Sequence, residues 1–337
     1  MAQEKLEAAT PPSTRGETVA PELGPAGSGG TLGLFLHEMR VRQWSKNLVL
    51  FAALIFSKNL LQIPMVLRSM LAFVVFCLLS GVVYTVNDLL DLEADRRHEV
   101  KRRRPLASGQ LRVRTALTGV VLVLGLALMG AALLGPRFFL ISVGFLAFNL
   151  AYSLVLKNIV IVDVISIAIS FLIRAIAGVV ALNTATVHLT ISPWLLVVTF
   201  FLSLFLGLCK RLHEYRSILD AGKHRSTLMA YSEELLNQLI NVAATGTLIA
   251  YSIYTIWPET VQHFGTENLM YTIPIVVAGL TRYMFLVYRR NLGGDPAEIL
   301  LTERSLWATQ RNQAITVAQS ERSVSRISAG SPPRLRR

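Results

Sequence analysis

The stretch Asn87-Asp88-Leu89-Leu90-Asp91-Leu92-Glu93-Ala94-Asp95 stands where a long apolar run ends. If the apolar helix continues through it, Asp88, Asp91 and Asp95 are spaced i, i+3 and i+7, which lines three carboxylates along one helical face. Such carboxylates repel one another unless a positive charge lies between them. Hard oxygen ligands favour Mg²⁺, which commonly shares its coordination shell with substrate phosphates. The spacing therefore predicts a magnesium site formed by the three aspartates.

A run of basic residues follows the motif and ends in Lys101-Arg102-Arg103-Arg104-Pro105. Its cations could hold phosphate oxygens that the metal does not reach. The competing interpretation is a solvated loop of mixed charge, which is what charge runs usually form. The adjacent apolar run favours function, because ionisable residues so close to a membrane span are costly and tend to be functional.

The composition is that of a multi-span membrane protein. Of the 337 residues, 53% are hydrophobic and only 16% are charged, which does not suit a soluble domain. The net charge of +12 lies mostly in the ends of the chain and in a few loops, so nucleic acid is not an expected partner. Phosphate groups and anionic lipid are expected instead. Cys77 and Cys209 lie in apolar runs, and we expect no disulfide.

Eight apolar runs are candidate membrane spans, and the distribution of loop charges orients them. The predicted spans are 48–64, 67–86, 113–134, 138–156, 159–182, 193–209, 236–257 and 270–288. With the N-terminus inside, the inner loops hold nearly all the basic residues, whereas the outer loops 183–192 and 258–268 contain no Lys or Arg. This asymmetry predicts that the polar loops 87–112 and 210–235 share the cytoplasmic side of the plasma (inner) membrane.

The expected organisation is a single membrane domain between two polar tails. Residues 1–30 contain almost no large apolar side chains, which predicts a disordered tail, and they do not resemble a signal peptide. An all-α bundle of about eight transmembrane helices is expected over 31–306, and a basic tail over 307–337. The sequence shows no ninth apolar run long enough to span a membrane, and it gives no indication of an oligomeric state.

Two further groups of residues carry chemistry. The loop after the sixth span begins with Lys210, Arg211 and Glu214, and Lys210 and Glu214 share a helical face. This loop either keeps positive charge on the inner side or binds phosphate opposite the aspartates. The lead-in to the fifth span and the span itself contain further polar residues: Tyr152, Lys157, Asn158, Asp163 and Arg174. A structural ion pair is the alternative for Asp163 and Arg174.

These residues resemble the UbiA-like superfamily of intramembrane prenyltransferases, whose first motif is Asn-Asp-x-x-Asp-x-x-x-Asp. Within it the chain looks most like the decaprenyl-phosphate phosphoribosyltransferase branch, over roughly residues 35–306. The supporting features are Arg42-Gln43-Trp44-Ser45-Lys46-Asn47, the Tyr152–Asp163 segment and Lys210-Arg211-x-x-Glu214. Relatives that prenylate aromatic acceptors carry a second Asp-x-x-x-Asp motif, whereas here Asp220 is followed four residues later by His224.

The resemblance implies that 5-phosphoribosyl diphosphate donates ribose 5-phosphate to a polyprenyl phosphate, with Mg²⁺ held by Asp88, Asp91 and Asp95. It implies that the following residues bind substrate: Lys46, Asn87, Arg103, Tyr152, Lys157, Asp163, Lys210, Arg211, Glu214 and Arg225. Two alternatives stay open. One is a prenyltransferase that moves a prenyl group from prenyl diphosphate to an aromatic acceptor, and the other is a lipid transporter that uses the buried charges as a pathway.

Overall fold

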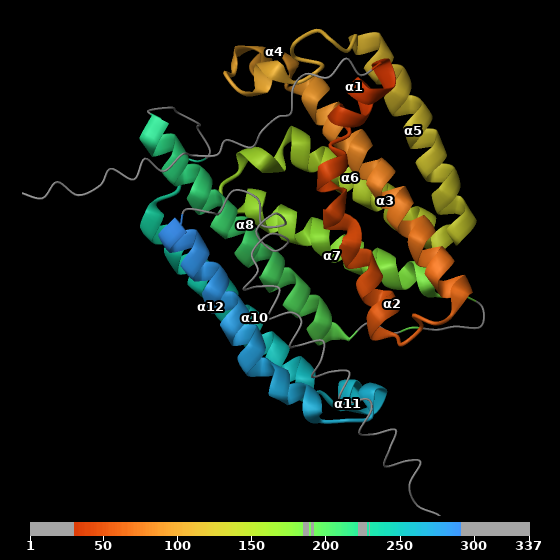
Figure 1. Cartoon of the computed structure of the whole chain (residues 1–337), viewed down its shortest axis with the longest axis vertical. Coiled ribbons are helices and arrows are strands. Elements are labelled where there is room, and N and C mark those ends of the chain that lie inside the picture. Colours follow the sequence, from red (N-terminus) through yellow and green to blue (C-terminus); the bar gives the residue numbers. More distant parts are fainter. Residues whose placement is uncertain (1–29, 185–188, 190–191, 222–227, 229, 291–337) are drawn as a thin grey trace, which may run out of the picture.

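The structure is a computed structural model, and it describes residues 30–184, 189, 192–221, 228 and 230–290 (Figure 1). Every regular element within these residues is a helix, as the apolar runs predict. Helices satisfy all backbone polar groups internally, which a lipid environment requires. Residues 1–29 and 291–337, which include most of both predicted tails, lie outside the described residues, and so do His224 and Arg225.

Among the described residues, seven helices are long and apolar enough to cross a membrane, by their length and composition. They are α3 (Ile63–Leu90), α5 (Val113–Leu134), α6 (Pro136–Leu154), α7 (Val162–Leu182), α8 (Pro193–Ala221), α10 (Glu233–Ile256) and α12 (Ile273–Arg290). Each overlaps one of the eight predicted spans. The protein is therefore a multi-pass membrane protein built as an all-α bundle, as predicted.

The first predicted span, 48–64, departs from this pattern because it is not one helix. It is divided between η1 (Val41–Phe51) and α2 (Ala52–Phe56), which follow α1 (Thr31–Glu38). Lys58 adopts a positive φ of 59°, and a single residue in this conformation ends a right-handed helix. The three short helices pack in succession along α3 (Figure 1), so the segment still follows the bundle without forming a continuous helix.

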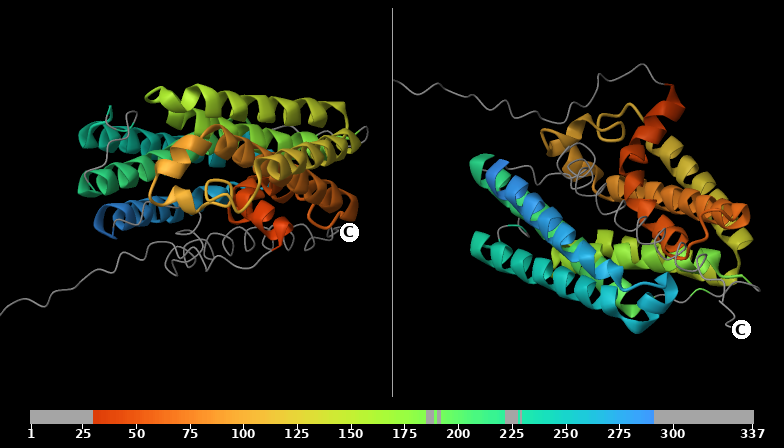
Figure 2. Two further views of the ribbon diagram at one scale, coloured as in Figure 1. Left: turned by 90° about the horizontal axis from the view of Figure 1, so that it is seen from above. Right: turned by 60° about the horizontal axis from the view of Figure 1, so that its bottom comes forward.

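The long helices alternate in direction, which gathers one set of connections at one end of the bundle. At this end α3 ends, α7 begins, and the last residues of α8 come near the start of α7. We call it the aspartate end, because α4 (Leu92–Arg97) and η2 (Lys101–Arg103) of the motif loop lie there (Figures 1 and 2). The predicted placement of the 87–112 and 210–235 loops on the same side is confirmed for their described residues.

The two largest clusters of buried side chains among the described residues hold the bundle together. One joins α8, α10 and α12 with the start of α7, and the Phe205 and Tyr283 ring centroids in it are 5.6 Å apart. The other joins α3, α5, α6 and α7 around Phe76, whose ring centroid lies 4.8 Å from that of Phe145. Buried alanines from α3, α5 and α7 complete the second cluster. Small residues let helix backbones approach closely, and such van der Waals packing stabilises helix association in lipid.

Gly178 of α7 allows the closest approach between the N-terminal segment and the bundle. A Cβ placed on it would overlap the carbonyl oxygen of Leu50 in η1. We expect Gly178→Ala to lower the free energy of unfolding by about 1–3 kcal/mol, because the backbone of η1 must move away. Thermal unfolding of the purified protein in detergent measures the effect. Gly144→Ala in α6 is the control, since no atom lies within 4 Å of its added Cβ; equal losses in both variants would contradict the prediction.

Candidate active site

The motif aspartates lie at the junction of two helices. Helix α3 ends at Leu90, Asp91 links it to α4, and the peptide N–H of Asp95 donates to the Asp91 carbonyl at 2.8 Å. Asp88 and Asp95 are each only 2% exposed, whereas the side chain of Asp91 is 33% exposed. The expected continuous helix is thus interrupted at Asp91, and this carboxylate does not share the environment of the other two.

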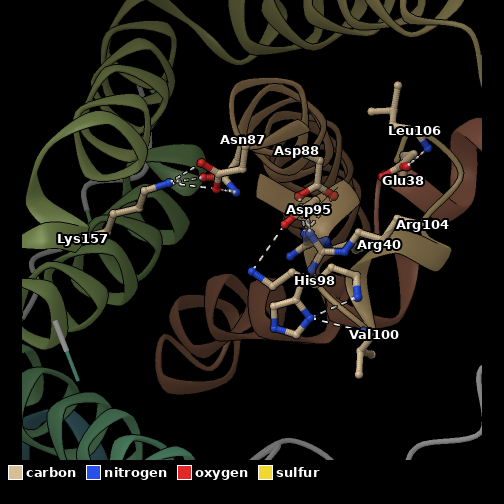
Figure 3. A network of polar contacts seen from close by, with 12 residues as sticks. Glu38, Arg40, Asn87, Asp88, Asp95, His98, Val100, Arg104, Leu106 and Lys157 are labelled. Carbon is tan, nitrogen blue, oxygen red and sulfur yellow. Dashed lines mark hydrogen bonds and ion pairs between the residues drawn. The ribbon is translucent and has the colours of Figure 1, made fainter. Parts of the chain in front are cut away.

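Asp88 and Asp95 converge on one guanidinium group (Figure 3). Nη1 of Arg104 lies 3.0 Å from Oδ1 of Asp88 and 2.6 Å from Oδ2 of Asp95. Nη2 of Arg40 donates to both oxygens of Asp88, at 2.6 and 2.9 Å, and Nζ of Lys101 lies 3.5 Å from Oδ1 of Asp95. Three cations therefore neutralise these two buried carboxylates, as burial of charge requires.

Asp91 has a different partner. Nζ of Lys157, in η3 (Leu156–Asn158), donates to its two oxygens at 3.0 and 2.9 Å and to Oδ1 of Asn87 at 3.4 Å. Nδ2 of Asn87 also donates to Asp91 at 3.2 Å. The first residue of the motif and the predicted phosphate-binding lysine are thus brought together around Asp91.

A third polar group surrounds Asp163 at the start of α7. Nε of Arg211 lies 2.9 Å from its Oδ2 without the alignment of a hydrogen bond, so this contact is an ion pair. Arg211 also donates from Nη1 to Glu214 at 2.6 Å. The Tyr231 hydroxyl donates to Asp163 at 2.7 Å and accepts from the N–H of Ile161 at 2.6 Å. Burial and then the bond to Asp163 raise the pKa of Tyr231, which keeps this donor protonated.

The segment between Lys157 and Asp163 connects the polar groups. Lys157 contacts Asp91, and Ile161, four residues later, contacts Tyr231, which belongs to the Asp163 group. Ile161 has a positive φ of 71°, which is rare for a β-branched residue and marks local strain. Such strain is found where the surrounding structure fixes a functional geometry, and here it lies between the two carboxylate groups.

The remaining predicted substrate-binding residues are dispersed. Nζ of Lys46 donates to Gln43 at 3.0 Å, and Nζ of Lys210 lies 4.0 Å from Glu214. Tyr152 is half-buried and close enough to Arg211 to interact electrostatically. Arg103 is exposed, and the next residue, Arg104, is the one that reaches the aspartates. Arg225 lies outside the described residues.

Arg174 lies deep in α7 and is not paired with Asp163, which contacts Arg211 instead. Its guanidinium donates from Nε to Asn47 at 2.8 Å and from Nη1 to the Ser170 hydroxyl at 2.8 Å. It also lies over the Phe145 ring, 4.7 Å from the centroid. Arg174 is thus held by neutral groups, and through Asn47 it fixes η1 against α7.

The sequence prediction did not single out four residues of the site: Glu38, Arg40, Lys101 and Arg104. Lys101 and Arg104 belong to the basic run that follows the motif, but which of its side chains reach the aspartates depends on the turn that η2 makes. Arg40 precedes Asp88 by 48 residues and adopts a positive φ of 51°, so neither spacing nor periodicity indicates the contact. Glu38 is 1% exposed and accepts from the N–H of Leu106 at 2.7 Å.

Glu38 gives the stability of the protein a pH dependence. Burial, and then the charge of nearby Asp88, raises the pKa of Glu38 from 4.5 to about 7 against the opposing effect of the Leu106 hydrogen bond. Between pH 4.5 and 7 the folded state binds more protons at this site than the unfolded state, so this contribution to stability falls as pH rises. We expect Glu38→Gln to remove it, and unfolding temperatures measured from pH 4.5 to 8 test this. Parallel curves for the variant and the unmodified protein would contradict the assignment.

The carboxylates suit Mg²⁺ in part. Among the described residues, no three His, Cys, Asp or Glu side chains gather closely enough to hold a metal ion by themselves. Asp88 and Asp95 do converge on one position, which the Arg104 guanidinium takes. Mg²⁺ commonly binds through one or two carboxylates, with waters and substrate phosphates completing its shell. The donor set therefore fits a magnesium ion held by two aspartates, with Asp91 joining only if it leaves Lys157.

Comparison with known proteins gives consistent matches. The sequence model of the UbiA prenyltransferase family matches residues 48–301. The decaprenyl-phosphate phosphoribosyltransferase of Mycobacterium tuberculosis is 34% identical over 80% of this chain and 87% of its own length. The Mycolicibacterium smegmatis enzyme of that name is 30% identical over 80% of this chain and 86% of its own length. A UbiA homologue from Archaeoglobus fulgidus, solved with GPP and Mg²⁺, superposes with a TM-score of 0.60 at 20% identity, covering 87% of this chain and 99% of that one.

Proposed function

Because the chain belongs to the UbiA prenyltransferase family, we propose that it is a polyprenyl-phosphate phosphoribosyltransferase. It transfers ribose 5-phosphate from 5-phosphoribosyl diphosphate to a decaprenyl-like phosphate and releases pyrophosphate. The relatives that carry this name and match most of the chain support the proposal. The observation that supports it most directly is that four cations contact the three aspartates. A donor with two phosphorylated positions and a phosphate acceptor bring many negative charges, which such cations can bind.

In this reaction an oxygen of the lipid phosphate attacks the anomeric carbon of the donor. The bond from that carbon to the diphosphate oxygen breaks, and pyrophosphate leaves with the electron pair. A phosphate monoester is mostly ionised near neutral pH because its second pKa is about 6, so the nucleophile needs no strong general base. This agrees with the network around Asp88, Asp91 and Asp95, whose ion pairs in the described part of the chain come from Arg and Lys side chains.

We propose that Asp88 and Asp95 hold Mg²⁺, with Asp91 as the third ligand. Bound there, the ion would neutralise the charge that builds on the departing diphosphate. Lys157 lies where it can bind a phosphate oxygen beside Asp91, and Lys46, Arg103 and Lys210 are proposed for the other phosphates. Arg211 and Arg225 were expected among these; Arg211 is already paired with two carboxylates.

We also propose that the aspartate end faces the cytoplasm across the plasma membrane. The segments at this end, including η2 and the last turns of α8, are rich in Lys and Arg, and inner loops carry the excess of basic residues. 5-Phosphoribosyl diphosphate is a polar solute and would reach the site from that side. The lipid acceptor would arrive through the bilayer.

The prenyltransferase alternative remains, because the Archaeoglobus fulgidus homologue was solved with a prenyl diphosphate and Mg²⁺. Membranes that contain the full chain separate the two reactions. We expect label from 5-phosphoribosyl diphosphate to enter the lipid fraction when decaprenyl phosphate and Mg²⁺ are present, and EDTA to abolish the transfer. Label that moves only from prenyl diphosphate to an aromatic acceptor would overturn the proposal. Membranes without the chain are the control.

A further inference from the structure

Arg104 occupies the position at which the two buried aspartates converge. One nitrogen, Nη1, contacts both Asp88 and Asp95, at 3.0 and 2.6 Å (Figure 3). A divalent ion that used the same two oxygens would lie within contact distance of this guanidinium. Two cations cannot share that position, because like charges at such a distance repel strongly. Binding of a metal between Asp88 and Asp95 therefore requires that the Arg104 side chain leave.

The surroundings of Arg104 allow this movement. Its side chain is 26% exposed, whereas those of Asp88 and Asp95 are 2% and 3% exposed, so the cation lies on the more open side of the carboxylates. Its backbone is fixed on both sides, because its N–H donates to Lys101 and its carbonyl accepts from Ser108 at 2.8 Å. Leu106 anchors the following turn at 2% exposure. A fixed backbone that carries a long, partly exposed side chain permits the guanidinium to move alone.

The freed guanidinium has a suitable new partner. Arginine presents a planar fork of N–H donors that matches phosphate oxygens bidentately. A diphosphate held beside the metal would offer such oxygens next to the position that Arg104 leaves. Arg40 differs, because it donates twice to Asp88 from a constrained backbone and also lies 5.0 Å from the centroid of the Tyr84 ring. Arg40 shares Oδ1 of Asp88 with Arg104, but it also donates to Oδ2 and can keep that second bond while Arg104 moves.

We infer that Arg104 is an exchangeable counterion: it bridges Asp88 and Asp95 before ligands bind, and it transfers to the donor diphosphate when the metal enters. The inference rests on the proposed function only in taking a divalent metal and a diphosphate as ligands. Its consequence is coupling between the two ligands. Metal alone must displace a strong ion pair, whereas metal and diphosphate together give the guanidinium a replacement partner, so each ligand favours the binding of the other.

The test measures metal binding without any donor. Mn²⁺ binding to the full chain in detergent is followed by electron paramagnetic resonance for the unmodified protein and for Arg104→Gln. We expect the variant to bind Mn²⁺ about tenfold or more tightly, because the competing cation is gone. The KM for 5-phosphoribosyl diphosphate should rise by a similar factor. Arg96→Gln is the control, since the ion pair of Arg96 within the described residues is with exposed Glu93 on α4, at 2.8 Å.

Unchanged or weaker Mn²⁺ binding by Arg104→Gln would overturn the inference. If that variant does not fold, Arg104→Lys provides the test of the exchange. A lysine keeps the charge but lacks the fork, so Mn²⁺ affinity should stay within a factor of about three while the donor KM rises; an unchanged donor KM would then refute the exchange. The proposed function can fail separately, because tighter Mn²⁺ binding by the variant without phosphoribosyl transfer by the unmodified chain would support the exchange and reject the donor.

Discussion

Asp91→Asn is expected to lower the rate of phosphoribosyl transfer by at least about a hundredfold while the bundle stays folded. The carboxylate is one-third exposed, and among the described residues it is paired with one cation, Lys157. An amide of the same shape therefore leaves no deeply buried charge without a partner. Its loss removes a negative charge that the site would use to hold metal and to orient Lys157, and the loss of such a group is typically this large. Initial rates with labelled donor measure the effect.

Glu93→Gln, which likewise replaces a carboxylate by an amide, is the matched control. Glu93 lies two residues further on, its side chain is 74% exposed, and its partner in the described part of the chain is Arg96. Transfer by Glu93→Gln should equal that of the unmodified chain. Asp88→Asn should also abolish transfer, with some loss of stability, because Asp88 is buried between Arg40 and Arg104. Near-normal turnover by Asp91→Asn in membranes that contain normal amounts of the protein would refute the role of this residue.

Seven of the eight membrane spans and the position of the candidate site were predictable because both depend on local sequence. Apolar runs of about 20 residues form helices in lipid whatever their neighbours do. The Asn-Asp-x-x-Asp-x-x-x-Asp spacing and the basic run place the site at the end of α3 without reference to distant residues. The sequence gives some indication of the break at Lys58, because the polar residues from Ser57 to Asn59 interrupt the apolar run 48–64.

The partners of the carboxylates were not predictable. The i, i+3, i+7 rule assumes an unbroken helix, and the interruption at Asp91 separates this residue from Asp88 and Asp95. Arg40 reaches Asp88 across 48 residues of sequence, and only packing of the N-terminal segment against α3 determines that contact. Arg211 was expected to bind phosphate because it lies in a basic loop that was predicted to face the aspartates. Its burial depends on how α8 packs against the start of α7.

Arg211→Leu should destabilise the protein by about 3–5 kcal/mol, the largest stability effect that the structure suggests. The side chain of Arg211 is 11% exposed, and it neutralises Asp163, whose side chain is 3% exposed. Removing one member of a buried ion pair leaves the other charge uncompensated, which is far more costly than losing an exposed pair. Tyr231 would still donate to Asp163, but a neutral hydroxyl cannot replace the guanidinium charge.

Arg216→Leu is the matched control for this prediction, because it makes the same change on α8 little more than one turn away. Arg216 pairs with Glu233, and their side chains are 24% and 40% exposed, so its loss should change stability by only about 0–1 kcal/mol. Thermal unfolding in detergent compares the two variants, and donor KM separates the two roles considered for Arg211. A variant of normal stability with a raised KM would identify Arg211 as a phosphate ligand. A large loss of stability instead identifies it as the counterion that allows α7 to begin with a buried aspartate.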